Sequence, residues 1–336
     1  MPLVEPALSW QCHYYRLASR SIGSYCLCVA CVVSNAVNYA ESSAMTRAWN
    51  LAARLIKVVY DLHLHSTYSD GSDTPYELVD KAHAFNCEVI ALTDHDSTDG
   101  YEEARKRASE LGMTLIKGVE MSIPARQLGT FHVLVYLPSE DTTILEQRLD
   151  LLREKRKERN ERLVASLRDA GIDITMEMVA AKATQGNVAR PHFAAVLIDL
   201  GVVDSIDEAF DRYLGDSTPF DIEKEGLSIE ELLQLTQESK GLASIAHPLT
   251  LRVSKEELTD MLERLRGLGL FGLESYYSRY SPSVRAELVE MANRIGLVPT
   301  GGSDYHGTFK VGLNPGVGEG DLRVPEESVA AILARL

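Results

Sequence analysis

Cysteine is scarce in this sequence of 336 residues, which contains only five, and those five are unevenly placed. Cys12, Cys26, Cys28 and Cys31 fall in the first 31 residues, and only Cys87 lies beyond them. A chain this long can bury a sizeable core without disulfide bonds. The distribution therefore excludes a disulfide scaffold and predicts a reduced, cytoplasmic protein.

Positive charge is also in deficit. The sequence has 34 Lys and Arg residues against 49 Asp and Glu residues, which gives a formal net charge of -15. Binding along a nucleic-acid polymer needs clustered Lys and Arg, so we expect no stable duplex nucleic acid as a partner. The balance still allows one small phosphate group to bind in a pocket.

A long apolar run is missing as well. Residues 22–37 form an apolar stretch that polar side chains interrupt and that is too short to span a bilayer, so we expect no membrane association. Arg16 and Arg20 precede it, as in a secretory leader with cleavage after Ala40. The alternative, which we favour, is that residues 1–57 are a mis-assigned N-terminal extension and that the protein proper begins at Met45.

From residue 58 onward, short apolar runs end abruptly in polar or ionisable side chains. These runs cover residues 58–60, 89–92, 115–119, 131–136, 242–246, 270–273 and 297–300. Such runs are typical of strands buried on both faces, as in parallel sheets. Segments with helical spacing lie between most of them, including 74–85, 101–111, 254–265 and 281–295. The pattern predicts an α/β fold, a TIM-like barrel of seven βα units. An open doubly wound sheet is the weaker alternative, because no Gly-rich dinucleotide loop follows the first strand.

The gap between residues 136 and 242 is too long for one crossover and has helical patterning. We therefore expect a small helical insertion domain at residues 140–225, with the barrel formed by 58–139 and 226–336. The segment from Arg153 to Arg162 is dense in charge. Such a run is ordinarily a solvated helix face with i,i+4 pairs, and the alternative is that part of it faces a phosphate.

Histidines and acids gather at the predicted strand ends. The histidines are His63, His65, His95, His132, His247 and His306, and the acids are Asp70, Glu120 and Asp304. Mixed imidazole and carboxylate ligands suit Mn²⁺, Zn²⁺ or Fe²⁺. Nine ligands exceed the need of one ion and Glu120 could bridge two, so we expect two or three divalent ions, which suit hydrolysis at phosphorus. A structural zinc site is the alternative, but such sites are usually closed and contain cysteine.

These motifs, in this order, resemble those of the PHP (polymerase and histidinol phosphatase) superfamily of metal-dependent phosphoesterases. The resemblance covers about residues 58–330 and implies a distorted (β/α)7 barrel that binds two or three divalent metals at the carboxyl ends of its strands. The motifs are Asp61-Leu62-His63-Leu64-His65-Ser66, Ser69-Asp70-Gly71, Thr93-Asp94-His95-Asp96, Gly118-Val119-Glu120, His132, Ala246-His247-Pro248 and Ser303-Asp304-Tyr305-His306.

The insertion resembles that of one subgroup, the nucleoside 3′,5′-bisphosphate phosphatases and related 5′-3′ oligoribonucleases. The matching stretches are Arg159-Asn160-x-x-Leu163 and Val188-Ala189-Arg190-Pro191-His192-Phe193. The resemblance implies that the nine residues named above are metal ligands, with Mn²⁺ expected first, and that Arg190 and His192 contact a substrate phosphate. The N-terminus of a helix beside a guanidinium group is a suitable anion-binding site. The alternative is that Arg190 pairs with an acid of the insertion.

We expect the protein to hydrolyse a phosphomonoester of a nucleotide, converting a nucleoside 3′,5′-bisphosphate to the 5′-monophosphate and phosphate. Asp304, His306 and Glu120 are the candidate catalytic residues. The alternatives are a 5′-3′ exoribonuclease on short RNA and a phosphatase of a small metabolite such as histidinol phosphate. A non-catalytic metal-binding module is an alternative of a different class. The expected partners are small phosphorylated nucleotides, with short oligoribonucleotides under the nuclease alternative.

Overall fold

The computed structural model describes residues 58–125, 128–138, 143–183, 188–215, 218–222 and 226–336. The chain divides between Ile56 and Lys57 into two units, and the fold described below belongs to the second. Residues 1–57, where the sequence predicts a leader or an extension, lie outside the described residues.

Seven strands form one sheet whose spatial order follows the chain, from β1 to β7. They are β1 (Val59–Leu64), β2 (Cys87–Leu92), β3 (Thr114–Ile123), β4 (Phe131–Leu137), β5 (Leu242–Ile245), β6 (Gly272–Tyr277) and β7 (Val298–Gly302). Backbone hydrogen bonds from His65 to Tyr305 (3.0 Å) and from Asp304 to His63 (2.9 Å) join the two edges. Gly302 permits this approach, because a Cβ there would collide with His63. The expected seven-stranded α/β barrel is confirmed.

The sequence predicts that all the strands run parallel, and β4 departs from this prediction. It runs antiparallel to both β3 and β5. A reversed strand brings its amino end to the edge where its neighbours carry their carboxyl ends. His132, the second residue of β4, therefore lies at the same edge as the other candidate ligands instead of following a strand end. Glu120 also lies inside β3, which continues to Ile123, and not at its end.

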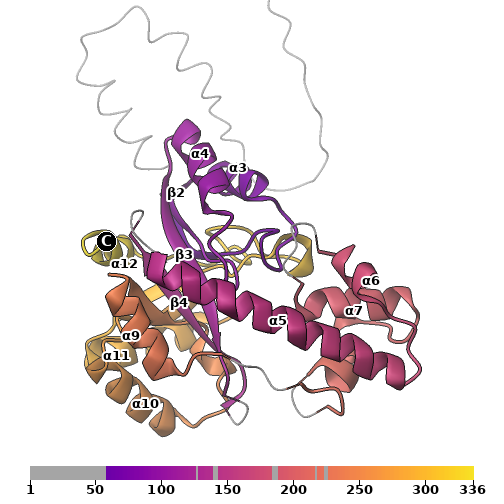
Figure 1. Cartoon of the computed structure of the whole chain (residues 1–336). Coiled ribbons are helices and arrows are strands. Elements are labelled where there is room, and N and C mark those ends of the chain that lie inside the picture. The colour runs from indigo at the N-terminus through magenta and orange to yellow at the C-terminus, as the bar shows by residue number, and fades with distance from the viewer. Residues whose placement is uncertain (1–57, 126–127, 139–142, 184–187, 216–217, 223–225) are drawn as a thin grey trace, which may run out of the picture. The chain divides into compact units, whose positions relative to one another are not determined.

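Helices surround the barrel (Figure 1). They are α3 (Pro75–Ala84), α4 (Tyr101–Leu111), α9 (Ile229–Glu238), α10 (Lys255–Gly267), α11 (Pro282–Ile295) and α12 (Glu326–Leu333), with short turns η3 (Pro248–Thr250) and η4 (Gly307–Phe309). The expected helix at residues 101–111 is confirmed to the residue, with Gly112 ending it in the left-handed conformation. Val329 and Ile332 of α12 pack with Leu62 and Leu134 in one buried cluster.

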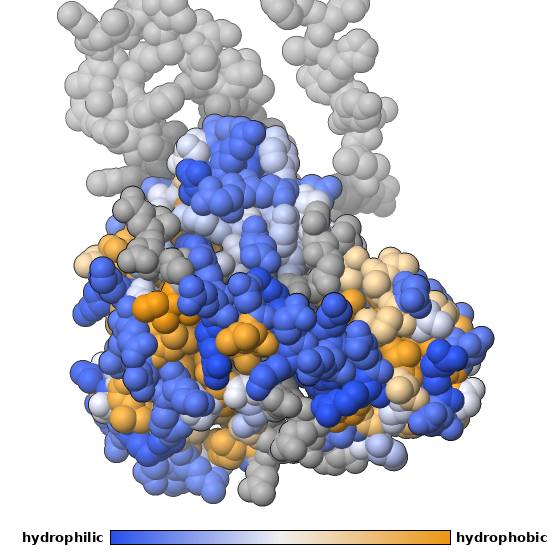
Figure 2. All heavy atoms as spheres, viewed as in Figure 1, coloured by the Kyte–Doolittle hydropathy of each residue, from blue (hydrophilic) through white to orange (hydrophobic). Residues whose placement is uncertain are grey.

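The remaining helices form a second group, with α5 (Thr143–Asp169) running from the barrel toward α6 and α7 (Figure 1). The group comprises α5, α6 (Met176–Ala180), α7 (Arg190–Asp199), α8 (Ile206–Ala209) and η2 (Phe210–Leu214). Leu145 and Leu149 of α5 pack into the barrel's largest cluster, whereas Leu163 and Leu167 belong to a separate core. Hydrophilic side chains cover the part of α5 that runs toward α6 and α7 (Figure 2). No helix in the described part of the chain has both the length and the apolar content to cross a membrane.

Candidate metal centre

All nine predicted ligands converge at one edge of the barrel. Eight of them form three overlapping groups in which one ligand atom per residue lies within 4.8 Å of the others. The groups are His65, Asp70, His95 and His306; His63, His65, Glu120 and Asp304; and His95, Glu120 and His132. The ninth, His247, places its Nε2 atom 3.0 Å from Glu120 Oε1. The sequence spacing therefore predicted a spatial cluster correctly, while the role of each residue as a ligand stays a prediction.

Glu120 lies at the centre of the cluster and is almost completely buried. Its Oε2 atom lies 3.1–3.3 Å from Nε2 of His63, His65 and His95. Its Oε1 atom lies 3.0 Å from His132 Nδ1 and from His247 Nε2. Burial disfavours its charge, but the surrounding imidazoles outweigh burial and hold the pKa of Glu120 well below its usual value. The two oxygens thus face two different sets of imidazoles, as a bridging carboxylate requires.

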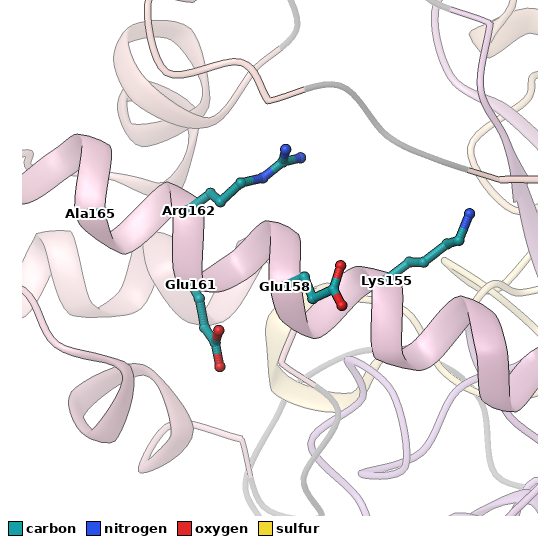
Figure 3. A pocket seen from close by; sticks show the side chains of 5 residues that line it. All are labelled: Lys155, Glu158, Glu161, Arg162 and Ala165. Carbon is teal, nitrogen blue, oxygen red and sulfur yellow. The ribbon is translucent and has the colours of Figure 1, made fainter.

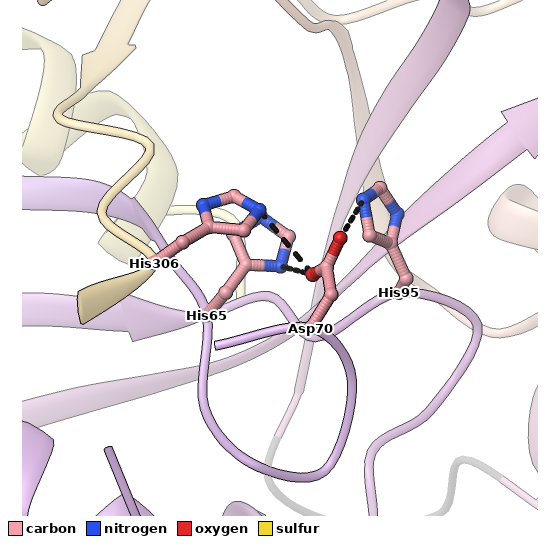
Figure 4. Close-up of side chains that lie close together, drawn as sticks. All are labelled: His65, Asp70, His95 and His306. Atoms are coloured by element: carbon pink, nitrogen blue, oxygen red, sulfur yellow. Dashed lines mark ion pairs between the residues drawn. The ribbon is translucent and has the colours of Figure 1, made fainter. Parts of the chain in front are cut away.

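Asp70 is the centre of the group drawn in Figure 4, in which three imidazoles surround one carboxylate. Its Oδ1 atom lies 3.2 Å from His306 Nε2 and 3.6 Å from His65 Nδ1, and its Oδ2 atom lies 3.7 Å from His95 Nε2. Burial lowers the pKa of His95 and of His306, so both rings are neutral at pH 7 and have lone pairs free for a cation.

Asp304 uses its two oxygens differently. Oδ2 accepts a hydrogen bond from Tyr277 Oη (2.9 Å) and one from Lys310 Nζ. Oδ1 lies 3.4 Å from Nε2 of His63 and of His65. The outer partners therefore fix the carboxylate so that Oδ1 remains directed at the imidazoles. Tyr277 and Lys310 are functional candidates that the sequence analysis missed.

A second layer of acids orients the predicted ligands. Glu274, an acid at a predicted strand end to which the sequence analysis gave no role, accepts from His63 Nδ1 (2.8 Å) and from the His247 backbone N–H (2.6 Å). A carboxylate on the far nitrogen of a ligand imidazole fixes its orientation and tautomer. The fully buried Asp61 accepts from the backbone N–H groups of His63, Ser303 and Gly316, and burial raises its pKa to about 6.

The backbone is strained at three positions of this edge. Asp96, His247 and Asp304 have positive φ angles of 50°, 26° and 54°, in the region that favours glycine. Each such residue costs about 1–3 kcal/mol and persists only where surrounding contacts enforce it. Two of the three are predicted ligands, so the fold holds them in place against a local preference.

The donor set fits divalent cations. Among the buried polar atoms of the described residues, Asp70 Oδ1, His95 Nδ1 and Asp304 Oδ1 have no hydrogen-bond partner. Two of these are carboxylate oxygens surrounded by imidazole nitrogens, and unpaired buried oxygens are costly without a counter-charge. The Nε2 atoms of His63 and His65 lie only 3.1 Å apart. Nitrogen and carboxylate oxygen donors converging in this way suit Mn²⁺, Zn²⁺ or Fe²⁺.

The two predicted substrate residues lie at the start of α7. His192 is buried, and its Nδ1 accepts from the Ala189 backbone N–H (2.9 Å). Burial lowers its pKa, and the Asp70 carboxylate opposes this effect. Its ring lies edge-on to Phe309, three residues after His306, with 6.2 Å between the ring centroids. Arg190 lies 3.6 Å from Asp221, which agrees with the alternative that it pairs with an acid of the helical segment.

The charge run of α5 divides between two faces of that helix. Lys155, Glu158, Glu161 and Arg162 are exposed around a surface pocket (Figure 3), as the ordinary expectation for a charged helix requires. Arg156, in contrast, reaches the barrel and pairs with Asp96, the residue after His95. Arg156 and its neighbour Arg159 were not singled out as site residues, because the sequence does not reveal which side of α5 faces the barrel.

Comparison with known proteins places this arrangement in a family. The PHP domain model matches residues 61–217. The chain is 34% identical over 262 residues to a 5′-3′ exoribonuclease of Haemophilus influenzae, covering 76% of this chain and 93% of the relative. It is 31% identical to a 3′,5′-nucleoside bisphosphate phosphatase of Chromobacterium violaceum, covering 76% of this chain and 90% of the relative.

A solved structure from Bifidobacterium adolescentis, described as a metal-dependent phosphoesterase, superposes with a TM-score of 0.71 at 29% identity and covers 82% of this chain and 96% of its own. Sequence, fold and donor chemistry agree, and the expected enzyme class, a hydrolase, is confirmed. The chain belongs to the PHP domain family of metal-dependent phosphoesterases.

Proposed function

We propose that the enzyme hydrolyses the 3′-phosphomonoester of a nucleoside 3′,5′-bisphosphate and releases the nucleoside 5′-monophosphate and phosphate. The observation that carries the proposal is that His192, at the start of α7 with Arg190, lies edge-on to Phe309, three residues after the predicted ligand His306, with 6.2 Å between the ring centroids. A phosphate held at the cluster would thus have a second cationic region beside it. The similarity to the Chromobacterium violaceum phosphatase supports this choice of substrate.

The nine clustered residues would hold two or three divalent cations, with Mn²⁺ expected first. The ligands are His63, His65, Asp70, His95, Glu120, His132, His247, Asp304 and His306. When bound, the cations supply activation of water and neutralisation of the charge that develops on the phosphoryl oxygens.

The chain's own residues bind and orient the substrate. Because His192 Nδ1 accepts from Ala189, its proton lies on Nε2, which can donate to a phosphate oxygen. Arg190 offers a planar set of donors suited to the same group. Glu120 holds the imidazoles on both sides of the centre, while Asp304 and His306 are the candidates for proton transfer to the leaving oxygen.

The test is phosphate release from adenosine 3′,5′-bisphosphate by the full chain, with Mn²⁺ added and after chelation. We expect turnover with Mn²⁺ and at least about 1000-fold less after chelation. A panel containing histidinol phosphate and other small phosphate esters tests the metabolite alternative. Absence of metal-dependent release from every nucleotide would refute the proposal.

A second candidate, a 5′-3′ exoribonuclease on short RNA, is favoured by a different observation. Arg156 and Arg159 of α5 add positive charge beside the barrel edge, which suits a substrate with more than one phosphate. The Haemophilus influenzae relative carries that name. Stepwise release of mononucleotides from 5′-phosphorylated tetraribonucleotides, at a kcat/KM above that for the bisphosphate, would establish it over the phosphatase.

A further inference from the structure

Asp94 is a buried acid that directly precedes the predicted ligand His95 but lies outside the three ligand groups, and it is 1% exposed. Its carboxylate accepts three hydrogen bonds, all from one short stretch after β1. Oδ1 accepts from the Ser66 backbone N–H (2.7 Å) and from Ser69 Oγ (2.6 Å), and Oδ2 accepts from Ser66 Oγ (2.7 Å). Because donors engage both oxygens, Asp94 suits a positioning role better than the role of a cation ligand.

These hydrogen bonds fix a tight turn, residues 66–71. Within it, the backbone N–H groups of Ser69 and Gly71 donate to the Ser66 carbonyl oxygen (3.1 and 2.9 Å). The close return of the chain requires glycine, because a Cβ at Gly71 would lie 2.5 Å from the carbonyl oxygen just before the turn. Asp70 belongs to the turn, so its position among the imidazoles of Figure 4 depends on the conformation of the turn.

Ser69 also connects Asp94 to a second predicted ligand. The Ser69 hydroxyl donates its one proton to Asp94, so its oxygen is left to accept from His65 Nδ1, which lies 3.3 Å away. A proton held on Nδ1 makes Nε2 the nitrogen that can bind a cation. This Nε2 atom lies 3.1 Å from Glu120 Oε2, inside the centre. Asp94 therefore acts on the orientation of His65 through Ser69.

The backbone of Asp94 contacts the strand that carries the central carboxylate. Its carbonyl oxygen accepts from the Glu120 backbone N–H (3.2 Å), and the Glu120 carbonyl oxygen accepts from the Asp96 N–H (3.1 Å). Side chain and backbone together thus join three segments that carry predicted ligands: the 66–71 turn, the residues after β2, and β3. These segments are separate in the sequence, so such contacts determine how their ligands meet.

The segment just after the turn is fixed independently of Asp94. The Ser72 backbone N–H donates to the His306 carbonyl oxygen (3.1 Å), and Tyr305 Oη donates to Asp73 Oδ2 (2.7 Å). The loss of the Asp94 side chain should therefore loosen the turn without detaching it from the barrel.

We propose that Asp94 is a positioning residue of the metal centre. Acting through Ser66 and Ser69, it sets the position of Asp70 and the orientation of His65 before a cation binds. The inference rests on the metal centre of the proposed function and deepens it, because it names the residue that assembles the group drawn in Figure 4. Asp70 depends most on these hydrogen bonds, since a turn carries it and not a strand.

Hydrogen exchange of the full chain without cations tests the inference independently of metal binding and turnover. In Asp94→Ala, the amides of residues 66–71 should exchange at least about tenfold faster than in the wild type, because three hydrogen bonds to the turn are lost. Exchange in α10 should be unchanged. Asp94→Asn keeps an oxygen that accepts from the Ser66 N–H and from Ser69 Oγ, so it should restore most of the protection.

Mn²⁺ binding tests the consequence for the centre. In Asp94→Ala, one Mn²⁺ ion should bind about 10- to 100-fold more weakly, and in Asp94→Asn every ion should bind within about threefold of the wild type. Competition with a fluorescent chelator measures the affinities. Thr236→Ala is the control for lost stability, because Thr236 is 2% exposed and its hydroxyl donates to the Leu232 carbonyl oxygen (2.8 Å). It should lower the melting temperature and leave Mn²⁺ affinity and exchange of the turn unchanged.

Ser69→Ala keeps the test valid if Asp94→Ala does not fold. It removes one hydroxyl and leaves the two hydrogen bonds from Ser66 to Asp94, so exchange of the turn should rise about three- to tenfold. Mn²⁺ affinity should fall by a similar factor, because His65 Nδ1 loses its acceptor. No change in either quantity would overturn the inference.

The outcomes separate the inference from the proposed function. Unchanged exchange of the turn in Asp94→Ala overturns the inference, and so does faster exchange with unchanged Mn²⁺ affinity. Equal losses in Asp94→Asn and Asp94→Ala also overturn it, because they would assign the effect to the charge and not to the hydrogen bonds. If the wild type binds no Mn²⁺ but Asp94→Ala exchanges faster, the metal centre of the proposed function fails, and Asp94 stands as the residue that positions the turn.

Discussion

Two charged regions meet at the barrel edge, and they have opposite character. At the strand ends, the carboxylates of Asp70, Glu120 and Asp304 keep oxygen atoms directed at imidazoles and suit cations. On α5 and α7, the positive charges of Arg156, Arg159 and Arg190 line two small cavities and suit an anion. Under the proposed function, the strands would supply the groups for chemistry, while the helical segment would supply the groups that bind the substrate.

The largest effect should follow the loss of the central carboxylate. Glu120→Gln removes one charged oxygen from a residue that faces five imidazoles, so we expect kcat/KM to fall at least about 1000-fold. Phosphate release with added Mn²⁺ measures this change. Glu88→Gln, an exposed acid on β2, is the control and should retain full activity. Near-normal turnover by Glu120→Gln would contradict the assignment of the metal centre to the strand ends.

The next effect in size should be a pH dependence of Mn²⁺ affinity, because protons compete with the cation for His65. In the cation-free protein, burial lowers the pKa of His65, but the nearby carboxylates of Asp304 and Glu120 outweigh burial and raise it to about 9. His65 therefore holds a proton at pH 7 that a cation must displace. Mn²⁺ affinity should rise by up to about tenfold per pH unit between pH 6 and pH 8, with proton release on binding. Calorimetry in buffers of different ionisation enthalpy measures both, and affinity independent of pH would contradict the assignment.

A smaller effect should follow the loss of an outer partner. Tyr277→Phe removes the hydrogen bond to Asp304 Oδ2 but leaves Lys310 in place, so we expect about tenfold weaker Mn²⁺ binding. Competition with a fluorescent chelator gives the affinity. Tyr276→Phe, one residue earlier on β6, should bind Mn²⁺ as the wild type does, and equal effects in the two variants would argue against a specific role for Tyr277.

The smallest effect on activity should come from the link between α5 and α7. Asn160→Ala leaves the buried Val188 carbonyl unsatisfied and should lower the free energy of unfolding by about 1–3 kcal/mol. It should also lower kcat/KM for the bisphosphate a few-fold, because the hydrogen bond fixes the position of Arg159 on α5 relative to Arg190 on α7. Urea unfolding and kinetics measure the two effects. Glu161→Ala, exposed on the same helix, should change neither.

Much of the strand-end centre could be predicted because its spacing is local. Two histidines two residues apart on an extended segment share one face, and the motifs that follow each apolar run placed all nine side chains at one edge. The helix at residues 101–111 was predicted to the residue, because Gly112 gives a clear stop. These features depend on short stretches of sequence, so they can be predicted without knowledge of the fold.

Other features depend on how distant segments dock. An apolar run does not encode strand direction, so the reversal of β4 and the position of His132 at its amino end were not predicted. Arg156 and Arg159 lie within a run of charges whose inward face is set by the packing of Leu145 and Leu149 on the barrel. Glu274 and Tyr277 act through residues far away in sequence, and no local pattern marks that role.

The most direct test of the central claim is the number of Mn²⁺ ions bound per chain, measured by plasma mass spectrometry after dialysis against Mn²⁺ and removal of free metal. Two or three tightly bound ions are expected for the wild type, and at least one fewer for Glu120→Gln. A wild-type chain that binds no ion, or a Glu120→Gln variant that binds as many as the wild type, would contradict a bridged metal centre at the strand ends.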